Sequence, residues 1–101
     1  MARTEPQDWT IFSNHGAVLL CIAARNDATM RELAGRVGIT ERATQRIVKH
    51  LCERGYVTRA RVGRRNSYAL HPELPLDEPA MRDHAVGELF GFVTPAAAVS
   101  P

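Results

Sequence analysis

The stretch GITERATQRIVKHLCERGY, residues 38–56, places basic and apolar side chains around a single helical period. At 100° per residue, one arc of this helix is mostly apolar and the opposite arc is basic. The apolar arc holds Ala43, Thr44, Ile47, Val48 and Leu51, and the basic arc holds Arg42, Gln45, Arg46 and Lys49. An ordinary solvated face would set acids four residues before the cations, and the middle of this arc does not. The basic face is therefore either solvated or used to bind an anionic partner.

Charge is distributed unevenly along the chain, although the 101 residues carry a net charge of only +2. Residues 31–65 contain nine Arg and one Lys against three Glu, whereas the segments on both sides are net acidic. Regularly spaced apolar residues interleave with these cations, so we expect the basic segment to be folded. A folded basic surface most often meets phosphate, which favours a nucleic acid partner.

Length and composition favour one globular domain, since 45% of the 101 residues are hydrophobic and a single core needs most of a chain this short. The longest apolar run, residues 17–24, is far shorter than the roughly 20 residues of a membrane span, and the N-terminus lacks a signal-peptide core. Cys21 and Cys52 lack the CxxC spacing of a zinc knuckle and form no disulfide framework. We therefore expect a soluble, cytoplasmic protein without membrane contact.

Two further helices are predicted before the basic helix. Residues 13–25 form a segment that is apolar nearly all round, so this helix should be buried on more than one side. Thr29 and Glu32 have the spacing of a capping box at the start of a second helix, which Gly38 ends. Because only about three residues separate the second helix from the basic one, these two helices should cross steeply.

After the basic helix, the sequence predicts two strands within residues 57–70, joined by a four-residue loop from Gly63 to Asn66. Four arginines lie on this hairpin: Arg59 and Arg61 on one face of the first strand, and Arg64 and Arg65 at the tip. Adjacent exposed cations repel each other, so their position indicates a protrusion that contacts phosphates or enters a minor groove. The alternative is that the charges protect an exposed strand edge.

The segment LAGRVGITERATQRIVKHLCERGYVTR, residues 33–59, resembles the equivalent stretch of MarR-like and ArsR-like bacterial transcriptional regulators. The resemblance covers roughly residues 13–72 and implies a winged helix-turn-helix, mainly α with a small β-hairpin (α+β). The implied order is a helix, an optional short strand, two helices, two strands and a final helix. In such proteins the second helix of the motif enters the major groove of DNA, and the hairpin, or wing, contacts backbone or minor groove.

This resemblance implies a set of DNA-binding residues. The recognition helix, about residues 40–54, would present Thr40, Arg42, Gln45, Arg46 and Lys49. The wing, about residues 57–70, would present Arg59, Arg61, Arg64 and Arg65. The chemistry agrees, because Arg can bind guanine and Gln can bind adenine through two hydrogen bonds each. We expect a sequence-specific regulator that binds double-stranded DNA; the alternative is a winged helix that docks protein and whose basic face is only solvated.

The C-terminal part departs from the larger members of this family. Residues 73–93 are proline-rich and then apolar at helical spacing, which predicts one short helix that needs a partner. The partner is either the first helix of the same chain or a second copy, and we expect a homodimer because readers of this type usually bind DNA as twofold dimers. The expected dimer contacts are Leu89, Phe90 and Val93. Residues 9–72 would form the DNA-binding domain, flanked by disorder at residues 1–8 and 94–101.

The sequence gives no signal for catalysis. Its four histidines have no metal-binding or acid–base spacing, and neither a Gly-rich phosphate loop nor a paired-carboxylate motif occurs. Cys21 and Cys52 fit structural thiols better than redox sensors. We expect no enzymatic activity, no cofactor and no metal, and the sequence leaves any small-molecule effector open.

Overall fold

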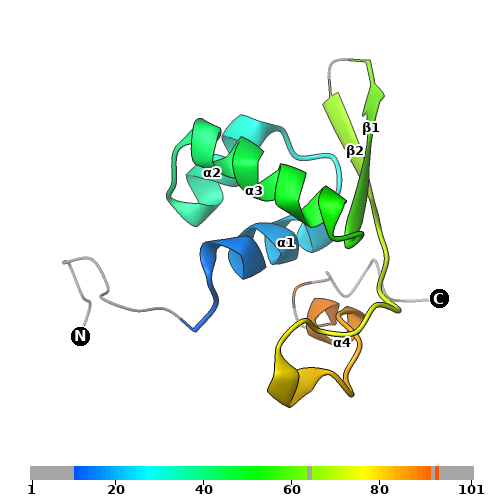
Figure 1. Ribbon diagram of the computed structural model, residues 1–101. Coiled ribbons are helices and arrows are strands. Elements are labelled where there is room, and N and C mark those ends of the chain that lie inside the picture. The colour runs from blue at the N-terminus through cyan, green and yellow to red at the C-terminus, as the bar shows by residue number, and fades with distance from the viewer. Residues whose placement is uncertain (1–10, 64, 92, 94–101) are drawn as a thin grey trace.

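The computed structural model describes residues 11–63, 65–91 and 93 of the chain (Figure 1). Its elements are α1 (Asn14–Ala24), α2 (Met30–Val37), α3 (Glu41–Glu53), β1 (Val57–Val62), β2 (Arg65–Leu70), the 3-10 helix η1 (Pro79–Met81) and α4 (Gly87–Phe90). The hairpin rises beside the end of α3, and the segment containing η1 and α4 lies at the opposite end of the molecule. The predicted class, mainly α with a small β-hairpin, is confirmed.

Capping interactions set the helix boundaries. The hydroxyl of Thr29 accepts a hydrogen bond from the Glu32 N–H at 3.1 Å, and the Glu32 carboxylate accepts one from the Thr29 N–H at 2.8 Å. This reciprocal pair is the predicted capping box. The hydroxyl of Thr40 accepts from the Ala43 N–H at 3.0 Å and so caps α3. Gly38 ends α2 in the left-handed conformation, with φ of 86°, which only glycine adopts at little cost.

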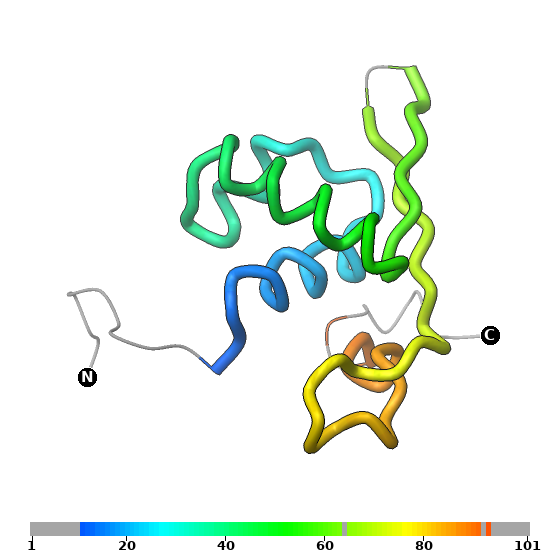
Figure 2. The backbone as a smooth tube through the Cα atoms, in the orientation of Figure 1, coloured from blue at the N-terminus to red at the C-terminus, as the bar shows by residue number. Residues whose placement is uncertain are grey.

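The core is centred on α1, which is covered by α2 and α3 on one side and by α4 on another. Its main members are Val18, Leu19, Leu20 and Ile22 of α1, Leu33 of α2, Ile47, Val48 and Leu51 of α3, and Val57 and Tyr68 of the hairpin. The tube in Figure 2 shows the same arrangement, with α1 between α3 and the C-terminal segment. Thr44 of α3 is also fully buried, and its hydroxyl donates to the carbonyl of Thr40 at 2.9 Å, so it carries no unsatisfied polar atom.

The hairpin has a shorter loop than the sequence predicts. β1 and β2 pair continuously until Val62 lies opposite Arg65, so two residues rather than four connect the strands. Gly63, the first of them, has a positive φ of 63°. Positive φ in a two-residue connection matches the right-handed twist of the strands. Arg65 and Asn66 consequently belong to β2, not to the loop.

A backbone contact joins the hairpin to the segment before α2. The Tyr68 N–H donates to the carbonyl of Asn26 at 2.9 Å. The structure describes no strand between α1 and α2, where the sequence analysis allows an optional short one; this single hydrogen bond occupies that place. Tyr68 is buried, so the middle of β2 is fixed against the helices.

The segment after β2 folds back onto its own chain. Val86 and Phe90 are buried in the core beside α1. Backbone hydrogen bonds from the Val86 N–H to Leu74 O, at 2.7 Å, and from the Gly87 N–H to Pro72 O, at 2.9 Å, close this segment on itself. Because the N–H groups of residues 86 and 87 are bound to Leu74 and Pro72, α4 begins at Gly87, two residues later than the apolar spacing of residues 85–93 suggests.

Side-chain contacts attach the same segment to the end of α3 and the start of β1. The Tyr56 hydroxyl donates to the carbonyl of Pro75 at 3.1 Å, and Arg54 forms an ion pair with Asp77.

No helix of the described residues is long and apolar enough to cross a membrane. The predictions of disorder at residues 1–8 and 94–101 fall outside the described residues.

We predict that Gly87→Ala destabilises the fold. A Cβ at residue 87 would lie 2.5 Å from Pro72 Cβ and 2.9 Å from Pro72 O. Relieving this overlap should cost about 1–3 kcal/mol of unfolding free energy, measured by urea denaturation. Gly91→Ala is the control, because the nearest atom to its added Cβ is at 4.0 Å. An equal loss in both variants would contradict the steric explanation.

Candidate nucleic-acid interface

The outward face of α3 carries cations that no acid among the described residues compensates. Arg42, Gln45, Arg46 and Lys49 are all exposed. Within the described part of the chain, Arg42, Arg46 and Lys49 form no ion pair. The opposite face of α3 is buried, and the cap at Thr40 fixes its first turn, so the helix presents these side chains from a rigid support.

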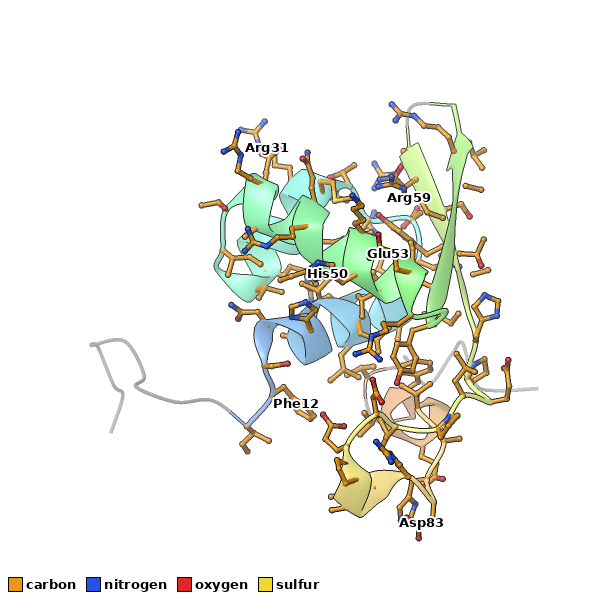
Figure 3. The ribbon with its side chains drawn as sticks, viewed as in Figure 1. Phe12, Arg31, His50, Glu53, Arg59 and Asp83 are labelled. Atoms are coloured by element: carbon orange, nitrogen blue, oxygen red, sulfur yellow. The ribbon has the colours of Figure 1, made fainter. Side chains whose placement is uncertain are left out.

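The first strand of the hairpin extends this basic face. Arg59 lies opposite Tyr68, and Arg61 lies opposite Asn66. Directly opposed residues of an antiparallel pair project to the same side, so both arginines share a side with buried Tyr68 and Val57. That side faces the helices, and Figure 3 shows Arg59 between the hairpin and α3. Arg59 and Arg61 are nonetheless exposed, because the hairpin extends beyond the helical core.

Arg65 has a different environment from the one predicted. Its Nε donates to the carbonyl of Asp27 at 3.1 Å, and its Nη2 donates to Glu32 Oε1 at 2.8 Å. Its guanidinium is therefore turned toward the helices and ties β2 to the turn before α2 and to the first turn of α2. The sequence predicts Arg65 at an exposed tip because its turn residues suggest a longer loop than the two residues found. The other predicted tip residue, Arg64, lies outside the described residues.

The two acids that hold Arg65 have lowered pKa values. The pKa of Glu32 is lowered chiefly by the hydrogen bond from the Thr29 N–H, with Arg65 contributing through charge and a hydrogen bond. The pKa of Asp27 is lowered chiefly by the hydrogen bond from Arg25 and further by the charges of Arg25 and Arg65. In both cases these effects outweigh partial desolvation, so both groups favour the ionised form that binds Arg65.

A histidine pair borders the basic face. His15 Nε2 and His50 Nδ1 lie 3.1 Å apart, and the two rings are parallel to within 3°. Burial, the charge of His50 and the charge of Arg46 lower the pKa of His15, in that order. The neutral pair can share one hydrogen bond between the facing nitrogens. Sequence spacing could not reveal this contact, because the two histidines belong to different helices.

The predicted dimer residues lie mostly within the chain's own core. Phe90 is only 8% exposed and packs in the core beside α1, whereas Leu89 and Val93 are partly buried against the same core. Phe90 therefore has little surface left to offer a second chain. Among the described residues, no group of three or more potential metal ligands occurs.

The chain is similar to a known protein family and to solved structures. The sequence profile of the MarR family matches residues 13–65. A search of curated proteins finds no match. Solved structures do match, each over about half of its own length.

Three of these solved structures share the fold of the matched part of this chain, and two of them are named as transcription regulators. MepR, a transcription regulator of the Staphylococcus aureus multidrug efflux pump MepA, matches with a TM-score of 0.53 and 19% identity, covering 60% of this chain and 47% of its own. The PcaV transcriptional regulator from Streptomyces coelicolor, solved with its natural ligand, matches with a TM-score of 0.54 and 29% identity, covering 61% of this chain and 46% of its own. A mutant of Lactococcus lactis ZitR matches with a TM-score of 0.53 and 20% identity, covering 70% of this chain and 49% of its own.

We predict that Glu32→Gln reduces the pH dependence of stability. Because folding lowers the pKa of Glu32, its carboxylate stabilises the native state above the unfolded pKa, and this contribution is lost as pH falls through the folded pKa. The wild type should therefore exceed the variant in stability at pH 7, and the difference should shrink between about pH 5 and 3 in thermal unfolding experiments. Glu73→Gln is the control, since Glu73 is exposed and forms no ion pair within the described residues. A constant difference across this pH range would contradict the assignment.

Proposed function

The chain belongs to the MarR family, and from this premise we propose that it is a transcriptional regulator that binds double-stranded DNA through α3 and the hairpin. The observation that carries the proposal is the set of uncompensated cations on the outward face of α3. A cation that lacks an intramolecular partner is available for phosphate or base contacts, and a rigid helix gives those contacts a fixed register. α3 would lie in the major groove as the recognition helix.

Within α3, the proposed roles differ along the helix. Arg42 and Arg46 are one turn apart and suit bidentate binding of guanine, and Gln45 between them suits adenine. The hydroxyl of Thr40 accepts a bond from its own helix but can still donate to a phosphate placed at the helix N-terminus. Lys49, in the later part of the helix, would contact the DNA backbone.

The hairpin would act as the wing. Arg59 and Arg61 share the side of the hairpin that continues the basic face of α3, so both are assigned to phosphates or the minor groove. Arg64 is assigned to the wing contact from the sequence alone. We assign Arg65 a positioning role instead, because its guanidinium is held by Glu32 and Asp27 and sets how the hairpin lies against α2.

We further propose that the chain acts as a homodimer on two half-sites, since this is the usual arrangement of helix-turn-helix readers. Leu89 and Val93 are the residues of the expected contact that retain exposed surface. Sedimentation velocity with and without duplex should show two chains per bound site. One chain per duplex at saturation would contradict the dimer but not the DNA binding.

The DNA-binding proposal predicts that α3 and wing variants fail differently. Arg42→Ala or Arg46→Ala should cost about 1–3 kcal/mol on the specific duplex and relax sequence choice, because base contacts are lost. Arg59→Ala or Arg61→Ala should weaken specific and scrambled duplexes alike and reduce the slope of log affinity against log salt by about 1 each. Fluorescence anisotropy at several salt concentrations, with a duplex selected from a random pool, measures both effects.

Arg82→Ala is the matched control for this experiment. Arg82 is an exposed arginine without an ion pair in the described residues, and it lies in the segment at the far end of the molecule from the hairpin. Its loss should change neither affinity nor the salt slope by more than a small factor. If no duplex is selected from the pool and no salt-dependent binding to duplex DNA is seen, the result supports the alternative, a winged helix that docks protein.

A further inference from the structure

A shallow groove of about 290 Å³ lies along α1 and α2, apart from the proposed DNA interface. One side is formed by Cys21 of α1 and by Arg25 and Ala28 of the connection between α1 and α2. Its α2 side is formed by Arg31, Glu32, Gly35 and Arg36, on the face of α2 opposite the buried Leu33 and Ala34. Neither α3 nor the hairpin contributes a lining residue. The groove is therefore a separate feature of the surface.

The charges around this groove do not balance. Arg25 is bound to Asp27 at 3.1 Å, and Glu32, the one acid that lines the groove, is bound to Arg65 at 2.8 Å. Arg31 and Arg36 are exposed and have no ion pair within the described part of the chain. Two guanidinium groups thus remain without a counter-charge at the rim of one groove. Guanidinium groups bind phosphate oxygens through pairs of parallel hydrogen bonds.

Gly35 leaves the surface between these arginines bare. It lies inside α2, where glycine is less favourable than alanine, and its φ is not positive, so the backbone conformation does not require glycine. A Cβ added there would have no atom within 4 Å, so packing within the chain does not require glycine either. The missing side chain keeps the α2 side of the groove open to a ligand.

We propose that this groove binds a small phosphate monoester, with the phosphate held by Arg31 and Arg36 and its organic part over Gly35, Ala28 and Cys21. The charge argues for this class, because a phosphate monoester carries nearly two negative charges at pH 7 and so matches the two uncompensated arginines. The size suits a small ligand, since the groove of about 290 Å³ lies just below the roughly 300–1,000 Å³ of drug-sized small-molecule sites. This site is independent of the DNA-binding face.

The test measures binding of phenyl phosphate to the full chain by isothermal titration calorimetry. Benzenesulfonate is the matched probe, because it has a similar shape but a single negative charge. We expect saturable binding of phenyl phosphate at one site and binding of benzenesulfonate weaker by about tenfold. Equal affinities for the two probes, or no saturable binding of phenyl phosphate, would overturn the proposal.

Variants then locate the site. The double variant Arg31→Gln, Arg36→Gln should weaken phenyl phosphate binding by more than about tenfold, whereas Arg82→Gln, which removes an exposed arginine elsewhere, should leave it unchanged. Gly35→Leu should also abolish binding by filling the groove, and its unfolding temperature should not fall, because leucine favours helix and has space here. Undiminished binding in Gly35→Leu, or an equal loss in Arg82→Gln, would overturn the site.

The same double variant separates this site from a DNA contact. If Arg31 and Arg36 instead bound the phosphates of a duplex, their loss would reduce the salt dependence of duplex binding while phenyl phosphate binding was absent from the wild type. That outcome would contradict the ligand site and leave the proposed function intact. A bound phenyl phosphate together with an unchanged salt slope is the result that we expect.

Discussion

The burial of α1 is the constraint on which the rest of the structure depends. A helix that is apolar on nearly every side must be covered on every side, and no single neighbour can do this. α2 and α3 cover one side, and Val86 and Phe90 of the C-terminal segment cover another. Because α3 turns its apolar arc inward to meet this demand, its cations have only the outward face to occupy. The basic surface is thus a consequence of how the core is completed.

The arginines of this chain divide by whether an acid holds them. Arg25, Arg54 and Arg65 have carboxylate partners and fix turns, the C-terminal segment and the hairpin in place. Arg42 and Arg46 have none within the described residues. Exposed ion pairs contribute little stability singly, so the value of the paired arginines lies in geometry: they orient one element relative to another. The unpaired arginines remain available for partners outside the chain.

Local signals account for most of what the sequence predicted correctly. The capping box of Thr29 and Glu32, the turn at Gly38 and the two faces of α3 each depend on residues within about one or two helical turns, and all are seen in the structure. The assignment of individual side chains to DNA stays a prediction.

Contacts between distant residues could not be predicted in the same way. The ion pair of Arg65 with Glu32 spans 33 positions, and the pair of His15 with His50 spans 35. The hairpin loop is two residues shorter than its turn composition predicts, because the register of the two strands sets its length. The choice of Phe90 between its own core and a second chain depends on the fit of the whole C-terminal segment, including the close approach of Gly87 to Pro72. The groove beside Gly35 likewise forms between α1 and α2, and the pattern of either helix alone does not predict it.

The register of the hairpin also limits how the wing can change in length. Arg59 and Arg61 share one side because side chains alternate along a strand, and buried Tyr68, which lies opposite Arg59, fixes that side toward the helices. Inserting one residue in each strand would turn every arginine beyond it to the other side. Only paired insertions of two residues per strand preserve the pattern, and each lengthens the hairpin by about 7 Å. Relatives with longer wings should therefore differ in discrete steps of reach along the duplex.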